Sequence, residues 1–175
     1  VAAVVVTFNR KVLLKECLDA LLSQTRQLDK IILIDNASSD GTPEFLAECG
    51  YLESELIEYV RLPVNTGGAG GFYEGVKRAH EQGFDWIWVM DDDAEPKLDA
   101  LEIMSTFFSE EVSAVCNLVI DKNKDIQYNH RGWFDFSLRN DRIVKCISSL
   151  DLHNQSLKIE FSSFVGLAIS RSAID

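Results

Sequence analysis

Three consecutive aspartates, Asp91, Asp92 and Asp93, are the residues of this sequence best suited to chemistry. They directly follow residues 86–90, an apolar run of the length of a buried strand. Adjacent carboxylates repel one another, so they remain ionised together only beside a cation or in solvent. Their oxygens are also the ligands that hard divalent cations prefer. The triplet therefore indicates either a divalent-metal site or an acidic turn that caps the next helix.

Two earlier apolar runs, residues 2–8 and residues 30–35, also finish in polar side chains. These polar ends are Thr7, Asn9 and Arg10 for the first run, and Asp35 and Asn36 for the second. If the strands are parallel, their carboxyl ends lie along one edge of a sheet, where α/β proteins bind ligands. We therefore expect these side chains to meet the aspartates there. The alternative is that each of them only caps a helix or forms a turn.

Strand and helix patterns alternate through residues 1–104. The expected strands are residues 2–8, 30–35, 56–62 and 86–90. The expected helices are residues 14–24, a helix with Thr42 as N-cap that runs to about residue 49, a helix around residues 72–79, and one that begins near Pro96. Such alternation with short connections predicts an α/β fold with a mostly parallel sheet flanked by helices.

The remaining residues, 105–175, change character. Strand-like runs are expected at residues 113–120, 143–147, 156–161 and 164–170, a polar turn at 121–125, an irregular aromatic stretch at 126–138, and the start of a helix at 171–175. No linker rich in Pro, Gly or Ser separates the two halves, so a single domain is expected.

A glycine-rich segment, residues 65–71, precedes the third expected helix. It is not a dinucleotide fingerprint, because the pattern begun at Gly68 would require a glycine where Tyr73 stands. A P-loop is also excluded, since no G-K-[ST] sequence is present. The glycines either let backbone approach a ligand at a helix start or form a flexible loop.

The net charge of -11 argues against nucleic acid as a partner, because such binding depends on Lys and Arg. A phosphate ligand near three aspartates would need a cation between them, so the charge favours a metal. The four cysteines contain no C-x-x-C pair, which indicates a reducing, cytoplasmic setting. Neither a membrane span nor a signal peptide is expected from the hydropathy pattern.

Four segments taken together resemble the family 2 glycosyltransferases of the GT-A fold. They are V-V-V-T-F-N-R, I-L-I-D-N-A-S-S-D-G-T, L-P-V-N-T-G-G-A-G-G-F and V-M-D-D-D-A-E-P, in the family's order and spacing. The resemblance covers residues 1 to about 104 and is strongest to bacterial rhamnosyl- and galactofuranosyl-transferases. It implies one GT-A catalytic domain over residues 1–175, incomplete at the C-terminus. Residues 1–104 would form the nucleotide-binding half, and residues 105–175 would begin the acceptor-side half.

The activity implied by this resemblance is inverting, metal-dependent transfer of a sugar from a UDP- or dTDP-linked donor. The acceptor would be a glycan or a lipid-linked glycan in cell-surface polysaccharide synthesis. A cytoplasmic location follows, with peripheral association at the inner face of the membrane. The general base would lie after Asp175, so no catalytic base is expected in this chain.

The resemblance also assigns roles to individual residues. Asp93 would be the main ligand of Mn²⁺ or Mg²⁺, with Asp91 assisting and Asp92 nearer the ribose. Asp35 would accept the N3–H of a pyrimidine base, and Arg10 would reach the diphosphate. The other expected substrate-binding residues are Thr7, Asn9, Asn65, Gly67 and Gly68.

Two alternatives remain open from the residues themselves. In a haloacid-dehalogenase-type phosphatase, Asp91 would be the nucleophile and Asp93 the acid. That class places its motif on the first strand and has Thr or Val where Ala94 stands. The other alternative is a non-catalytic module that binds nucleotide sugars. Trp133 and Phe134 are either core aromatics or rings that stack on an acceptor sugar.

Overall fold

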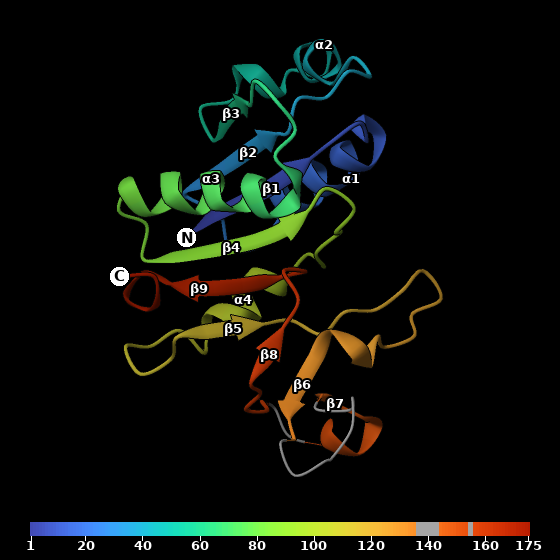
Figure 1. Ribbon diagram of the computed structural model, residues 1–175, viewed down its shortest axis with the longest axis vertical. Coiled ribbons are helices and arrows are strands. Elements are labelled where there is room, and N and C mark those ends of the chain that lie inside the picture. The colour runs from blue at the N-terminus through green and yellow to red at the C-terminus, as the bar shows by residue number, and fades with distance from the viewer. Residues whose placement is uncertain (136–143, 154–155) are drawn as a thin grey trace.

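The computed structural model describes residues 1–135, 144–153 and 156–175. Its main element is a six-stranded sheet in the order β3-β2-β1-β4-β9-β5 (Figure 1). The strands are β1 (Ala2–Thr7), β2 (Lys30–Asp35), β3 (Ile57–Arg61), β4 (Trp86–Asp91), β5 (Ala114–Cys116) and β9 (Leu167–Ser170). The first four strands are parallel, and β9 is antiparallel to both β4 and β5. The predicted α/β fold with a mostly parallel mixed sheet is confirmed.

Helices cover both faces of this sheet. Successive residues of its central strands therefore point alternately into two buried cores, one on each face. Three helices pack into one core: α1 (Lys11–Leu22), α2 (Thr42–Glu48) and α4 (Ala100–Ser105). The opposite core is closed by α3 (Gly67–Glu81), which lies across the sheet in Figure 1. Burial on both faces explains why the central strands are continuous apolar runs rather than alternating ones.

Two glycines set the distance between α3 and the sheet. A Cβ atom at Gly71 would lie 2.5 Å from Val6 Cγ1, and one at Gly75 would lie 2.3 Å from Val4 Cγ1. Because these glycines are four residues apart, they share one face of the helix. The helix can therefore lie directly on β1, which brings its first turn to the carboxyl end of that strand.

A second, smaller sheet lies beyond β9 and β5, on the side away from β3 (Figure 1). It has the order β7-β6-β8, formed by β6 (Arg131–Phe134), β7 (Val144–Cys146) and β8 (Phe161–Ser162). The buried Arg131 joins the two sheets, since its Nη2 donates to the carbonyls of Asn117 at 2.8 Å and Val165 at 2.6 Å. Four short 3-10 helices complete the description: Tyr51–Glu53, Tyr128–His130, Ser149–Asp151 and Arg171–Ala173.

Two expectations in the first half were wrong in detail. Of the two interpretations of the glycine-rich segment, the flexible loop is wrong, because α3 begins at Gly67 and the glycines that follow form its first turns. Gly41 is the N-cap of α2, with φ of 83°, so Thr42 is the first helical residue. The Thr42 hydroxyl donates to Asp40 Oδ1 at 2.5 Å, and this bond fixes the turn before the helix.

The second half departs further from the expectations. The strand expected at residues 113–120 stops at Cys116, because the segment that precedes its neighbouring strand β9 turns away at Gly166, where φ is 69°. β8 has two residues instead of six, and the chain after β9 forms a 3-10 turn. The stretch expected to be irregular contains β6. Residues 136–138 of that stretch, and residue 143 of the strand expected at 143–147, lie outside the described residues. No helix in the described ranges has the length and apolar character needed to cross a bilayer.

Candidate functional site

The polar ends of β1, β2 and β4 meet at one edge of the main sheet, as the sequence predicts. The strand register pairs Thr7 with Asp35 and Val6 with Asp91. The groups are therefore neighbours across the sheet, although they come from strands up to 85 residues apart in the chain.

Asp92 is the inward member of the aspartate triplet. Only 3% of the residue is exposed, and its Oδ2 accepts a 2.7 Å hydrogen bond from the Thr7 hydroxyl. Arg10 Nη1 lies 3.4 Å from its Oδ1. Burial raises the pKa of Asp92, while the bond from Thr7 and the guanidinium of Arg10 oppose that shift. Asp92 thus ties β4 to β1.

Asp93 is the outward member, with 51% of its side chain exposed. Arg10 Nη1 donates to its Oδ2 at 3.0 Å, so one guanidinium serves both Asp92 and Asp93. Partial burial, and then the negative charges of Asp93 and Asp92, raise the pKa of Asp91. Three carboxylates and one guanidinium leave an excess of negative charge at this edge, which a cation would relieve.

The donor set at the end of β4 fits a hard divalent cation. Asp91 and Asp93 present carboxylate oxygens, and Asp93 reaches solvent. Across the described residues, no group of three His, Cys, Asp or Glu side chains is arranged to hold a metal alone. One or two carboxylates together with substrate phosphates are the usual ligands of Mg²⁺. The site thus suits a cation that a diphosphate would share.

The carboxylate of Asp35 is fully buried and already hydrogen-bonded. Its Oδ1 accepts from Ser38 N at 2.7 Å, and its Oδ2 accepts from the Tyr59 hydroxyl at 2.6 Å. Arg61 Nε lies 3.8 Å from Oδ2. Burial, and then the bond to Asp35, raise the pKa of Tyr59. In this structure Asp35 therefore holds the neighbouring strand and the turn that follows β2.

Asn9 fastens the loop after β1 to the loop after β2. Its Oδ1 accepts from Ser39 N at 2.7 Å, and its backbone N–H donates to Ser38 Oγ at 3.0 Å. Asn9 and Ala37 both have positive φ, at 55° and 64°. Left-handed backbone in residues other than glycine is strained, and such positions cluster at functional sites.

Asn36 connects the end of β2 to the start of α3. Its Oδ1 accepts from Thr66 N at 2.8 Å, and its Nδ2 donates to the Gly67 carbonyl at 2.9 Å. Asn65 Oδ1 accepts from Gly67 N at 2.8 Å. A Cβ atom at Gly67 or Gly68 would meet no atom of the described residues within 4 Å. The start of α3 is therefore open to a ligand.

Four residues beyond the predicted site residues take part in these contacts: Asn36, Ser38, Tyr59 and Arg61. Tyr59 and Arg61 were not predicted as site residues, because they belong to β3, a strand for which no functional side chain was expected. The pairing of β3 with β2 could have indicated them, since it places Arg61 directly beside Asp35. Asn36 had been noted only as a polar strand end.

The overall arrangement is that of a GT-A glycosyltransferase: parallel strands ending in carboxylates beside a glycine-rich helix start. Two solved structures share the fold. The mannosyltransferase PcManGT from Pyrobaculum calidifontis, in complex with GDP-Man and Mn²⁺, superposes with a TM-score of 0.56 and 24% identity over 69% of this chain and 35% of that chain. GalNAc-T7, with UDP, GalNAc and Mn²⁺, superposes with a TM-score of 0.69 and 15% identity over 99% of this chain and 35% of that chain.

The chain belongs to glycosyl transferase family 2, whose model matches residues 2–175. It is 39% identical over 126 residues to the galactofuranosyltransferase GlfT1 of Mycolicibacterium smegmatis, which covers 67% of this chain and 40% of that protein. The chain thus spans less than half the length of this relative. The resemblance to the family is confirmed, and the phosphatase alternative is set aside.

Proposed function

We propose that this chain is the donor-binding part of an inverting, metal-dependent glycosyltransferase. The observation that carries the proposal is the edge of the main sheet where β4 ends. There, Arg10 is the one cation of the described residues that pairs with Asp92 and Asp93, beside a half-buried Asp91. The solved structures with Mn²⁺ and a nucleotide or nucleotide sugar, named above, support a donor of this class.

Asp91 and Asp93 would hold Mn²⁺ or Mg²⁺ in this proposal. When bound, the ion would neutralise the leaving nucleoside diphosphate as a Lewis acid. Arg10 would turn from the carboxylates toward the diphosphate, since its side chain is about half exposed and the ion would replace its charge. Asp92, held by Thr7, would keep β1 and β4 aligned and lie nearest the ribose.

The nucleotide would lie along the loops after β1 and β2 and the start of α3. Gly67 and Gly68 leave room for it, and the side chain of Asn65 shapes that turn. Asn9 would fix the loop on the other side. Asp35 would accept the N3–H of a pyrimidine base after the Tyr59 side chain moves aside, because the carboxylate is fully buried beside the Tyr59 hydroxyl.

The acceptor would be a glycan or a lipid-linked glycan of a cell-surface polysaccharide, in line with the similarity to a galactofuranosyltransferase. Inverting transfer needs a general base that takes the proton of the acceptor hydroxyl. We place that base after Asp175. A lipid-linked acceptor would bring the protein to the inner face of the membrane by peripheral contact.

Thermal unfolding of the intact protein with UDP or dTDP, in Mn²⁺ and then in EDTA, tests this proposal. A nucleotide at a hundred times its Kd stabilises by about 2.7 kcal/mol, which is roughly 5–11 °C for a domain of this size. Asp93→Asn should remove the metal-dependent part of the shift. Asp85→Asn is the matched control, since Asp85 is exposed at the opposite end of β4.

Two results would overturn the proposal separately. If neither nucleotide raises the Tm, the chain does not bind this donor class. If the shift is equal in Mn²⁺ and in EDTA, and persists in Asp93→Asn, then Asp91 and Asp93 are not metal ligands.

A further inference from the structure

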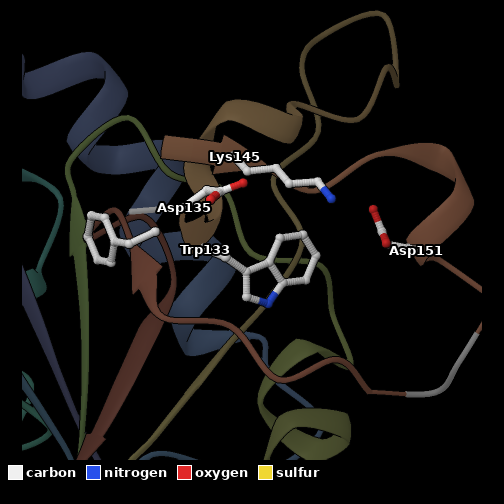
Figure 2. A pocket seen from close by; sticks show the side chains of 5 residues that line it. Trp133, Asp135, Lys145 and Asp151 are labelled. Carbon is white, nitrogen blue, oxygen red and sulfur yellow. The ribbon is translucent and has the colours of Figure 1, made fainter. Parts of the chain in front are cut away.

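A hollow of about 360 Å³ lies on the small sheet, away from the end of β4. Figure 2 shows Trp133, Lys145 and Asp151 facing it, and Phe134 and Asp135 complete its lining. Ligand pockets typically occupy about 300–1,000 Å³, so the hollow is large enough for a small ring. None of these residues belongs to the donor site described above.

The indole of Trp133 forms a fixed platform in this hollow. Trp133 on β6 lies directly opposite Lys145 on β7, so both side chains leave the same face of the sheet. Lys145 Nζ lies 5.9 Å from the centroid of the indole. Trp133 Nε1 donates to the Lys158 carbonyl at 2.9 Å, which sets the orientation of the ring.

Gly132 allows this platform to form. A Cβ atom there would lie 2.1 Å from the Lys145 carbonyl oxygen and 2.7 Å from Phe161 Cε1. Phe161 in turn packs against Phe134, with ring centroids 5.6 Å apart. The absence of a side chain at Gly132 therefore lets the strands and the aromatic rings pack tightly beside the half-buried indole.

The rim of the hollow offers both hydrogen-bond donors and acceptors. Asp151 Oδ2 accepts from Ser148 N at 2.8 Å and from Ser148 Oγ at 2.7 Å. These bonds lower the pKa of Asp151 and leave its Oδ1 to accept from a ligand. Lys145 supplies the N–H donors of its ammonium group.

The charges of the lining select the class of ligand. Asp151 and Lys145 carry opposite charges, so this pair gives no net attraction for a phosphate or another anion. The Lys145 ammonium, 5.9 Å from the indole centroid, repels a cationic ligand at that ring. A neutral sugar fits, because its C–H face packs on the indole while its hydroxyls donate to the Asp151 carboxylate and accept from the ammonium.

We propose that this hollow binds a neutral sugar residue of the acceptor glycan, with Trp133 as platform and Lys145 and Asp151 as hydrogen-bonding partners. The assignment to the acceptor rests on the proposed glycosyltransferase function. The binding of a sugar does not depend on it, because the lining shares no residue with the donor site.

The test uses ¹⁹F NMR of the intact protein labelled with 5-fluorotryptophan, without nucleotide or metal. The Trp133 resonance is identified by its loss in Trp133→Phe. The probes are methyl galactofuranoside, methyl galactopyranoside and methyl rhamnopyranoside. At least one should shift this resonance in a saturable manner, with a Kd on the order of 1–10 mM. Lys145→Gln should weaken that binding about tenfold. Lys122→Gln, at an exposed lysine outside the hollow, should not.

Several outcomes would overturn the proposal. One is a Trp133 resonance that no neutral glycoside moves, in a protein whose buried Trp86 and Trp88 still give dispersed signals. Tighter binding of methyl galacturonate than of the neutral glycosides would refute the charge argument. A Trp133 shift caused by UDP and Mn²⁺ alone would assign the hollow to the donor. A nucleotide-dependent Tm shift without glycoside binding would support the proposed function and refute the sugar site. Glycoside binding without a nucleotide-dependent Tm shift would support the sugar site and refute the proposed function.

Discussion

Replacement of Thr7 by Val tests whether the buried Asp92 carboxylate depends on one hydroxyl. Thr7 is 1% exposed, and its Oγ1 donates to Asp92 Oδ2 at 2.7 Å. Valine keeps the shape of the side chain and removes only the donor. Asp92 would then retain the backbone N–H of Phe8 and the more distant Arg10, whose Nη1 lies 3.4 Å away. The variant therefore leaves a buried charge with less compensation.

The expected loss is about 1.5–3 kcal/mol at neutral pH, the range for a hydrogen bond to a charged group. For a domain of this size, this corresponds to a fall in Tm of roughly 3–12 °C. The pKa of Asp92 is already raised above 3.8 by burial, and removal of the Thr7 bond would raise it further. A raised folded-state pKa contributes stability that is present below the unfolded value and is lost as the pH rises through the folded pKa. The penalty of Thr7→Val should therefore shrink as Asp92 becomes protonated.

The assay is urea unfolding of both proteins at pH 7.5 and near pH 4, with Thr106→Val as the control. The Thr106 hydroxyl donates to the Ile103 carbonyl at 2.7 Å on an exposed helix end, so that variant should change stability little at either pH. A Thr7→Val penalty of the same size at both pH values would show that the hydroxyl does not act through the Asp92 charge. A penalty below about 0.5 kcal/mol would show that Asp92 is solvated.

Three further substitutions probe the packing of α3 and the edge of the sheet where β4 ends. Gly75→Ala should destabilise by about 1–3 kcal/mol in urea unfolding, because its Cβ would lie 2.3 Å from Val4 Cγ1, and an unchanged midpoint would refute the close packing of α3. Gly68→Ala should change the free energy of unfolding by less than about 0.5 kcal/mol, since only open space surrounds that position. The same variant should bind UDP more weakly in calorimetry, and an equal UDP affinity would exclude the start of α3 from the site. Arg10→Gln should tighten Mn²⁺ binding in the absence of nucleotide by about tenfold, because it removes the cation that competes for Asp92 and Asp93. Weaker Mn²⁺ binding in Arg10→Gln would show that the guanidinium supports the metal.

The central strands were predictable because burial on both faces makes them continuous apolar runs. Their parallel direction followed from the alternation with helices, and with it the convergence of their polar ends. The contacts within that edge were not predictable. The bond from Thr7 to Asp92 joins residues 85 positions apart, and only the register of β1 against β4 brings them together.

The small sheet was only partly predictable. The strand expected at residues 143–147 contains β7, whereas only Phe161 of the strand expected at residues 156–161 belongs to β8, whose two residues are too few to show the alternation that identifies a strand. β6 pairs closely through Gly132, a residue that normally weakens a strand prediction. The opposed Trp133 and Lys145 therefore had no shared signal in the sequence, although each had a suitable type for binding a sugar.

The aspartate triplet shows what the fold adds to a motif. In the sequence, Asp91, Asp92 and Asp93 are three equal carboxylates. In the structure, Asp92 is 3% exposed and bound by Thr7, whereas the side chain of Asp93 is 51% exposed and, within the described residues, bound by the half-exposed Arg10. Asp92 already has a donor that does not leave when a cation arrives, so it can serve the alignment of the strands. Asp93 has only a partner that a metal ion can displace. Asp93→Asn and Asp92→Asn should therefore differ in kind, since the first would change metal affinity and the second would change stability.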